Sequence, residues 1–292
     1  MSIDKLQNQI RKLKNPSMVS FALHPSYVPK AYLETVSDIP SAYGIYAKAL
    51  LTALKGIVPA VRFSFASFSL HGAKGMEVLR ELLVTASQQG FYVLLDTPEL
   101  LSAEAAEQAA ELLFENGEAW PFNGLLLTFY IGSDALKPFV SKIKDRDQDL
   151  FLTIRTANRS ASELQELLTG SRLVYTAAAD MAKRLGESVP GRFGYSRIAG
   201  MGPATSADVL RTLRGKYSEL FLLVDGYEFS GANAKNCSFA FDQLGHGAIV
   251  CAGSTITAAW KNETDVDSDP IIMAQQAAER MKKNLSRYVT VL

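Results

Sequence analysis

The sequence has no surplus of either charge, because its 292 residues include 30 lysines and arginines against 30 aspartates and glutamates. A chain without net charge has no general attraction to nucleic acid or to an anionic membrane surface. It also lacks any run near the roughly 18 consecutive apolar residues of a membrane-spanning helix, and its first residues lack the apolar centre of a secretory signal. We therefore expect no nucleic-acid partner and no membrane partner.

Cysteine and histidine, the commonest ligands of transition metals, are scarce. The chain has two cysteines, Cys237 and Cys251, and three scattered histidines, His24, His71 and His246. None of them has the spacing of a metal-binding motif, so we expect no metal site. Two cysteines in so long a chain are typical of the reducing cytoplasm, and we interpret both as buried thiols.

Eight short apolar runs alternate with segments of helical patterning. Each run is continuously apolar, as is typical of parallel strands covered on both faces. Eight strands, each followed by a helix, indicate an α/β fold, a (β/α)8 TIM barrel in which residues 1–292 form a single domain. An open doubly wound sheet is the alternative, but it usually has a glycine-rich loop after its first strand, where this chain has HPSYVPKAY. The predicted strands are 18–23, 60–65, 92–97, 124–129, 150–156, 196–201, 220–226 and 247–253.

Local signals predict where several helices begin. Residues 205–216 have the spacing of an amphipathic helix, with Thr205 or Ser206 as its N-cap. The pattern of residues 4–15 predicts an amphipathic helix that closes the bottom of the barrel, and partner binding is the alternative. We interpret Thr97-Pro98-Glu99 as a helix start, with a new pocket as the alternative, and DVDSDP at 265–270 as the capped entry to the last helix rather than a calcium loop. Two further amphipathic helices are predicted at 75–90 and 102–117.

Six stretches carry a resemblance to a known family. Through these stretches the sequence resembles the orotidine 5'-phosphate decarboxylases of the longer bacterial kind. The stretches occur in the same order as in that family and are spread over nearly the whole chain. The stretches are NPSMVSFALHP (15–25), TFYIGSDALKPF (128–139), LFLTIRTANRSASELQ (150–165), AGMGPAT (199–205), DGYEFSG (225–231) and GHGAIVCAGSTITAAW (245–260). The resemblance implies a homodimeric barrel, a carboxy-lyase of pyrimidine nucleotide synthesis, that uses no metal or organic cofactor.

The catalytic motif of that family is altered in this chain. The family has a lysine at the end of strand two and D-x-K-x-x-D after strand three, whose lysine protonates the carbanion and whose last aspartate enters the partner's site. Here the strand-two lysine corresponds to Arg62, and the motif keeps Asp96 but has Pro98 for the lysine and Leu101 for the second aspartate. Glu99 cannot replace the lysine, because its charge has the wrong sign beside Asp96.

The family's substrate-binding positions are altered as well. The ribose-holding aspartate of strand one corresponds to Ala22, and the phosphate-gripping arginine after strand eight corresponds to Ser254. The phosphate loop of strand seven reads Asp225 to Ser230 and includes Gly226 and Glu228, so it adds two carboxylates where a phosphate would bring like charge. The base-binding segment T-S-N keeps Thr156 and Asn158 around Ala157.

Two charged groups have more than one interpretation. Arg62 and Asp96 are a remnant of the family's charged network or a structural ion pair between neighbouring strand ends, and we favour the ion pair. Asp225 and Glu228 form a new acid/base pair, a cation site or a solvated loop, and we favour the solvated loop because no third ligand is evident.

These substitutions predict a decarboxylase-like pseudoenzyme that has lost both catalysis and phosphate binding and that binds or regulates something else. The alternatives are an enzyme with a reassigned strand-end site for a ligand without phosphate, and an active orotidine 5'-phosphate decarboxylase. As partners we expect a second copy of the chain, with an intact paralogue as a further possibility, and a small molecule that the sequence does not identify.

Overall fold

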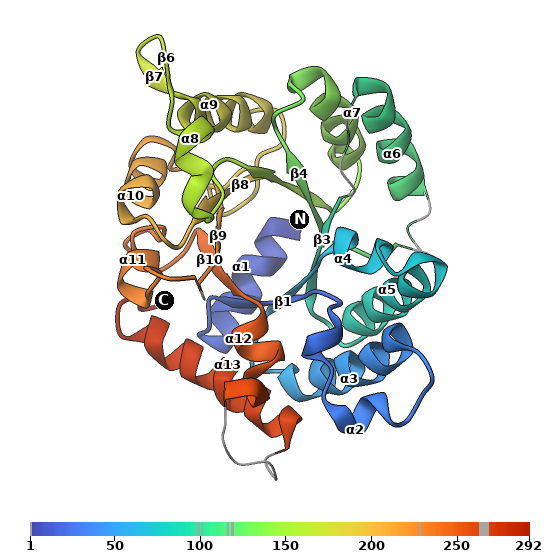
Figure 1. The fold of residues 1–292 in the computed structure, drawn as a ribbon. Helices are drawn as coiled ribbons and strands as arrows, with labels where there is room; N and C mark the ends of the chain where they lie inside the picture. Colours follow the sequence, from blue (N-terminus) through green and yellow to red (C-terminus); the bar gives the residue numbers. More distant parts are fainter. Residues whose placement is uncertain are drawn as a thin grey trace.

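The computed structural model describes residues 2–97, 100, 102–115, 117, 120–227, 229–262 and 269–292. Eight parallel strands close into a barrel in the order β1-β10-β9-β8-β5-β4-β3-β2, with helices around it (Figure 1). This confirms the predicted (β/α)8 TIM barrel. The barrel strands are β1 (Ser17–Phe21), β2 (Ala60–Phe63), β3 (Tyr92–Asp96), β4 (Gly124–Thr128), β5 (Asp149–Thr153), β8 (Ile198–Pro203), β9 (Leu222–Asp225) and β10 (Ala248–Ala252).

The longer helices pack their apolar faces against the strands. Buried residues recur at three- and four-residue steps, as Val78, Leu79, Leu82 and Leu83 do, so each helix presents one apolar stripe to the barrel. The helices of eight or more residues are α1 (Ser2–Leu13), α3 (Ile39–Leu54), α5 (Gly72–Gln88), α6 (Ala103–Glu115), α7 (Ser133–Lys144), α9 (Val174–Gly186), α10 (Ala207–Lys216) and α13 (Pro270–Ser286).

Shorter helical turns lie in the loops between strands and longer helices. They are η1 (Pro25–Tyr27), α2 (Lys30–Leu33), α4 (Phe65–Ser69), η2 (Arg159–Ala161), α8 (Ser162–Gln165), α11 (Ala234–Ser238), α12 (Ser254–Thr257) and η3 (Ala259–Asn262). Several of them follow the carboxyl ends of strands, so the loops at that end of the barrel are built from compact turns.

Helix α1 closes the amino-terminal end of the barrel, as predicted. Its side chains Ile3, Leu6 and Ile10 are buried. The Gln7 amide oxygen accepts a hydrogen bond from the backbone N–H of Gly247 at 3.0 Å, just before β10, and an Asp4 carboxylate oxygen accepts the N–H of Arg192 at 2.9 Å. The helix is therefore fixed by an apolar face and by polar contacts to the loops that lead into the strands.

Two predicted helix starts agree with the structure. The Ser206 side chain accepts the N–H of Val209 at the start of α10, and Asp269 accepts the N–H of Ile271 at the start of α13. The predicted helix start at Thr97-Pro98-Glu99 lies partly outside the described residues. Of its members, the Thr97 hydroxyl donates to the carbonyl of Leu126 on β4, and the next described helix, α6, begins at Ala103. Pairing with the neighbouring strand satisfies the hydroxyl that would otherwise cap a helix.

A small antiparallel hairpin after β5 was not predicted. Strands β6 (Leu168–Thr169) and β7 (Arg172–Leu173) project from the barrel beside α9 (Figure 1). The turn includes Gly170, whose φ of +63° is in the left-handed region that glycine adopts without strain. Strands of two residues are too short to leave a periodic pattern in the sequence.

Candidate ligand-binding site at the strand ends

A charged network crosses the carboxyl-terminal mouth of the barrel. The Arg62 guanidinium donates to both carboxylate oxygens of Asp96, from Nε at 2.7 Å and from Nη2 at 2.9 Å. Its third nitrogen, Nη1, donates to Asp225 at 2.9 Å. One cation is therefore shared by two carboxylates, and all three guanidinium nitrogens are used.

The strand order explains how these groups meet. Arg62 on β2 lies in register between Ser20 on β1 and Leu94 on β3, and Asp96 ends β3, so the first contact joins neighbouring strands. Asp225 ends β9, which is separated from β2 by β1 and β10, so the second contact spans the mouth. Only a long side chain that points into the barrel can make both contacts.

Burial and mutual attraction set the ionisation of the network. Burial alone would lower the pKa of Arg62, but Asp96 and then Asp225 raise that pKa well above its ordinary value. Burial raises the pKa of Asp96 above its ordinary value, although the charge and hydrogen bonds of Arg62 act in the opposite direction. Arg62 is therefore a permanent cation that cannot give up a proton near neutral pH.

The network forms one side of a cavity of about 230 Å³ at the strand ends. Arg62 is the one cation among the described residues that line it, against the two aspartates. Most other polar side chains there carry a hydroxyl, namely Ser20, Tyr27, Ser64, Ser254 and Thr257. An anion placed here would meet two carboxylates and an arginine already paired with both.

The loop after β9 is folded tightly against the loop after β5. Gly226 has a φ of +79°, and a Cβ added to it would lie 2.4 Å from the Cβ of Ala157 and 2.9 Å from Cδ2 of Phe229. Glycine is the residue that fits this conformation and this close approach. The Phe229 ring thus packs closely against Gly226 in the loop after β9.

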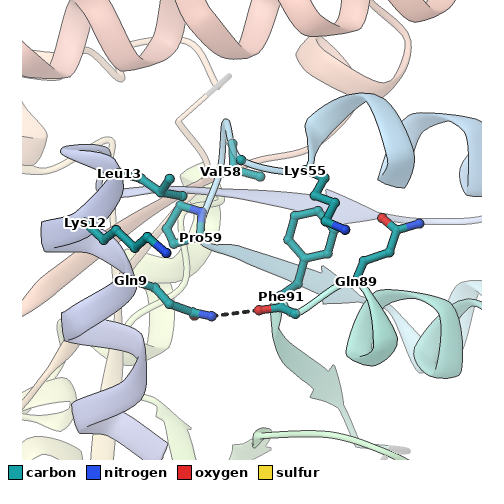
Figure 2. A pocket seen from close by; sticks show the side chains of 10 residues that line it. Gln9, Lys12, Leu13, Lys55, Val58, Pro59, Gln89 and Phe91 are labelled. Carbon is teal, nitrogen blue, oxygen red and sulfur yellow. Dashed lines mark hydrogen bonds between the residues drawn. The ribbon is translucent and has the colours of Figure 1, made fainter.

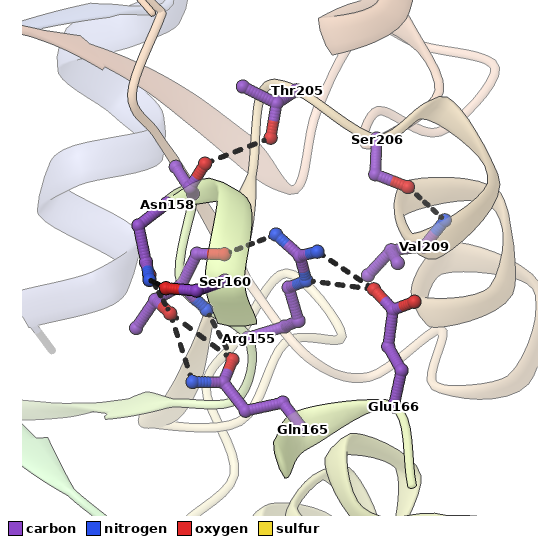
Figure 3. A network of polar contacts seen from close by, with 10 residues as sticks. Arg155, Asn158, Ser160, Gln165, Glu166, Thr205, Ser206 and Val209 are labelled. Atoms are coloured by element: carbon purple, nitrogen blue, oxygen red, sulfur yellow. Dashed lines mark hydrogen bonds and ion pairs between the residues drawn. The ribbon is translucent and has the colours of Figure 1, made fainter. Parts of the chain in front are cut away.

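A second cavity, of about 470 Å³, lies beside the first, and Phe229 lines both. Its described lining contains Arg155, Arg159, Asn158 and Ser230 and no carboxylate. Arg155 donates to one oxygen of Glu166 from Nη2 at 2.8 Å and from Nε at 3.1 Å, and Nη1 donates to the carbonyl of Thr156 (Figure 3). Arg155 is thereby held in place, with all its nitrogens engaged.

The structure brings most of the sequence-predicted site residues to these two cavities. Arg62, Asp96, Gly226 and Ser254 line the first cavity, as does Ala22. Their contribution to binding or catalysis stays a prediction.

The other predicted binding residues lie on the side of the second cavity. Asn158 and Ser230 line it, whereas Thr156 supports it from behind, donating from its hydroxyl to Asn158 Oδ1 at 2.6 Å. The predictions for Pro98, Glu99, Leu101 and Glu228 fall outside the described residues.

The interpretation of Asp225 as part of a solvated loop is wrong. Its side chain is 26% exposed and pairs with Arg62. The ion pair of Arg62 with Asp96 was anticipated, but the third member was missed because β2 and β9 are far apart in the sequence. The position of Asp225 at a strand end was the signal that could have found it, since inward-facing strand-end side chains converge at the mouth. Phe229 was missed too.

A third cavity, of about 130 Å³, lies at the opposite end of the barrel (Figure 2). It is lined by Lys12 and Leu13 of α1 and by residues before β2 and β3, and Gln9 donates there to the carbonyl of Gly90 at 2.7 Å. Active sites of such barrels lie at the carboxyl ends of the strands, whereas this end serves stability. We therefore place the candidate site at the mouth with Arg62.

Two further observations concern the described part of the chain alone. Within it, no group of three or more His, Cys, Asp and Glu side chains is arranged to hold a metal ion. Among the helices described, none combines the length and the apolar character needed to cross a membrane.

Comparisons with known proteins show which proteins the chain resembles in sequence. No protein-family model matches the chain. The chain is 24% identical over 286 residues to a protein named orotidine 5'-phosphate decarboxylase from Clostridium novyi. The aligned residues cover 98% of this chain and 98% of that protein. The chain is 28% identical over 262 residues to one from Rhodopirellula baltica, covering 86% of this chain and 87% of that one.

Solved structures agree in fold. One described as a putative orotidine 5'-phosphate decarboxylase from Streptomyces avermitilis has a TM-score of 0.80 at 18% identity, covering 99% of this chain and 95% of that one. The orotidine monophosphate decarboxylase of Leishmania donovani has a TM-score of 0.73 at 22% identity, covering 98% and 99%.

The fold and the strand-end site define a (β/α)8 barrel of the kind that carries its chemistry at the carboxyl ends of the strands. Within that class, the chain is similar over nearly its full length to proteins named orotidine 5'-phosphate decarboxylase. The resemblance read from the sequence is confirmed.

Proposed function

We propose that this chain does not decarboxylate orotidine monophosphate and is a pseudoenzyme that binds a ligand in the strand-end cavity. The observation that carries the proposal is the binding of Arg62 by Asp96 and Asp225. Loss of carbon dioxide leaves an electron pair on carbon that must receive a proton, and a guanidinium whose pKa is raised well above its ordinary value does not supply one. In sequence, the family's lysine is replaced by Pro98, which has no acidic proton.

The ligand of this cavity is a hydroxyl-bearing molecule without a phosphate at the ends of β9 and β10. In sequence, Asp225 begins the stretch that corresponds to the family's phosphate loop, and Ser254 corresponds to its phosphate-gripping arginine. Phe229 packs against Gly226 in the loop after β9. Hydroxyl side chains and a carboxylate–guanidinium network match the donors and acceptors of sugars and nucleosides. The role of binding is regulatory or carrier-like, because Arg62, the one cation among the described lining residues, does not act as a proton donor.

The test is release of carbon dioxide from orotidine monophosphate, with the Clostridium novyi relative as positive control. We expect no release above a buffer control, either by the chain itself or by a variant carrying Pro98→Lys and Leu101→Asp. The variant restores the family's acid, but Ala22, Ser230 and Ser254 still fail to hold the substrate, and remote binding energy is what lowers the barrier. Turnover of orotidine monophosphate by the unchanged chain at an ordinary enzymatic rate would contradict the proposal.

One observation favours a second candidate, an enzyme with a reassigned site. Asp96 borders the cavity and burial raises its pKa, which is the environment of a group that exchanges protons. In that case unphosphorylated nucleosides are converted to a product, and Asp96→Asn abolishes the conversion. A thermal-shift screen with nucleosides, bases and sugars would find the ligand in either case, because specific binding raises the unfolding temperature.

The proposed partner is a second copy of the chain, in a dimer formed through the strand-end face, with an intact paralogue as the alternative. A symmetric dimer needs only one self-complementary surface. Leu101 replaces the family's partner-directed aspartate, so Leu101→Asp introduces an unpaired carboxylate that should weaken association. Sedimentation over a dilution series measures this, and a monomeric wild type or an unweakened variant contradicts it. A cytoplasmic location stays a prediction from the two cysteines.

A further inference from the structure

The third cavity, called the bottom cavity from here on, lies where three helices end (Figure 2). Lys12 belongs to the last turn of α1, Lys55 follows the end of α3, and Gln89 follows the end of α5. The space of about 130 Å³ is large enough for several water molecules or for a ligand of a few carbon atoms. None of these residues lines the cavities at the mouth of the barrel.

The described lining of the bottom cavity includes two cations and no carboxylate. The cations are Lys12 and Lys55, and Figure 2 shows them on opposite sides of the cavity, with Lys55 beside the Phe91 ring. Neither ammonium group forms a hydrogen bond or ion pair with another described residue. Two like charges that face one space repel each other, and an anion placed between them is attracted to both.

Two side-chain amide oxygens at the same cavity have no hydrogen-bond donor. The amide nitrogen of Gln9 donates to the carbonyl of Gly90 at 2.7 Å, and that of Gln89 donates to the Thr52 hydroxyl at 3.3 Å. The oxygen of each amide is buried and accepts no hydrogen bond from the described residues. A buried acceptor without a donor is destabilising, so these two oxygens favour a ligand that brings a donor of its own.

The helix ends themselves explain only part of this arrangement. Lysines near the carboxyl end of a helix interact favourably with its dipole, but the dipole does not explain the unpaired amide oxygens. The last carbonyls are also satisfied locally: that of Leu54 accepts the N–H groups of Ile57 at 3.0 Å and Val58 at 3.2 Å, and that of Ala86 accepts the N–H of Phe91 at 3.2 Å. The ends of α3 and α5 therefore present few free carbonyls that would repel an anion.

We propose that the bottom cavity binds a small hydroxydicarboxylate. Lys12 and Lys55 each take one carboxylate, and the ligand hydroxyl donates to the amide oxygen of Gln9 or Gln89. Each part of the ligand answers one observation, namely the two separate charges, the unpaired acceptors and the small volume.

The expected effect of this ligand is on stability rather than on catalysis, because the amino-terminal end of such barrels carries no active site. Pro59 and Phe91 line the cavity directly before β2 and β3, so a bound ligand joins α1 to the entries of these two strands. The inference goes beyond the proposed function, because it assigns a ligand at the other end of the barrel and uses no residue of the mouth.

The test is calorimetric titration of the full-length protein with malate and, separately, with succinate, at equal ionic strength in a buffer free of carboxylates and phosphate. The two acids have the same carbon chain and the same charge, but only malate has a hydroxyl. We expect saturable binding of malate. Succinate should bind about tenfold more weakly, because it leaves both amide oxygens without a donor.

Variants of the lining residues locate the ligand. Lys12→Gln and Lys55→Gln should each weaken malate binding about tenfold, because each removes one charge-assisted contact. Lys216→Gln is the matched control: it changes an exposed lysine at the end of another helix, α10, outside the lining of the cavity, and should leave the affinity unchanged. Gln9→Met or Gln89→Met should reduce malate binding to the level of succinate without changing the binding of succinate.

Several results would overturn the proposal. One is the absence of saturable malate binding, and another is malate binding that both lysine variants leave unchanged, since the ligand then lies elsewhere. A loss at only one of the two lysines contradicts a dicarboxylate, and equal affinities for malate and succinate contradict the role of the amide oxygens. Decarboxylase activity, if found, would contradict the proposed function and leave this result untouched, because the titration involves no turnover.

Discussion

Two arginine–aspartate clusters occupy opposite ends of the barrel. At the mouth, the side chains of Arg62, Asp96 and Asp225 are 15%, 19% and 26% exposed and border a cavity. At the bottom, Asp149 is fully buried with Arg197, their nearest charged atoms 3.6 Å apart, under helix α1. The same chemistry is thus open to a ligand at one end and sealed at the other.

The partners of the bottom cluster are structural. Tyr92 donates its hydroxyl to Asp149 at 2.7 Å, joining the starts of β3 and β5. Arg197 donates to the backbone carbonyls of Arg146 and Gln148 in the loop that enters β5. Each of these groups serves the backbone or another strand, whereas the mouth cluster presents its charges to a cavity. The contrast assigns stability to the bottom cluster and ligand contact to the mouth cluster.

The largest expected effect is from Arg197→Met. It removes the counter-charge of a buried aspartate and two donors to backbone carbonyls, so we expect a loss of about 3–4 kcal/mol in the free energy of unfolding at pH 8. Urea denaturation measures the loss. Adding Asp149→Asn should recover part of it, because the unpaired charge is then absent. A loss below about 1 kcal/mol would show that the bottom cluster is dispensable and would remove the contrast.

The next effect concerns pH. Burial raises the pKa of Asp149 from 3.8 to about 7, although Tyr92 and Arg197 act to lower it. A carboxyl with a raised pKa in the folded state stabilises the fold at low pH, and that contribution is lost as the pH rises from about 4 to about 7. We expect the wild type to lose roughly 2–3 kcal/mol of stability between pH 5 and pH 8 relative to Asp149→Asn. Urea denaturation of both proteins at the two pH values checks it, and parallel pH profiles would refute the raised pKa.

The smallest effect on stability is expected at the mouth. Arg62→Met leaves Asp96 and Asp225 near one another without a cation, but both are partly exposed and can be hydrated, so we expect a loss of about 1–2 kcal/mol. Asp225→Asn, which keeps the shape and one hydrogen bond, should cost less. Ligand binding in the mouth cavity should fall in both variants. A loss at Arg62 as large as that at Arg197 would mean that the mouth cluster is mainly structural.

The barrel could be predicted because each strand is buried on both faces and therefore continuously apolar in sequence. The features that could not be predicted depend on small local contacts. Thr97 has the chemistry of an N-cap, yet its hydroxyl pairs with β4 and α6 begins later. The hairpin of β6 and β7 is held by a turn at Gly170 rather than by a periodic pattern.

The site could be predicted only in part, because its members come from distant strands. Arg62 and Asp96 lie near the carboxyl ends of the adjacent strands β2 and β3, so their pairing follows from the barrel order. The contact of Arg62 with Asp225 depends on the reach of one side chain across the mouth, and the packing of Phe229 depends on the conformation of Gly226. Neither of these has a signature in residue spacing.

The central claim is that Arg62, the one cation among the described residues that line the mouth cavity, does not supply the proton that the carbanion of a decarboxylation needs. It is tested most directly with the protein in large excess over orotidine monophosphate, followed for many hours by release of carbon dioxide and formation of uridine monophosphate. We predict the same rate as in buffer, with and without Arg62→Met. Conversion faster than the buffer control that disappears on Arg62→Met would contradict the account, because the paired arginine would then take part in the reaction.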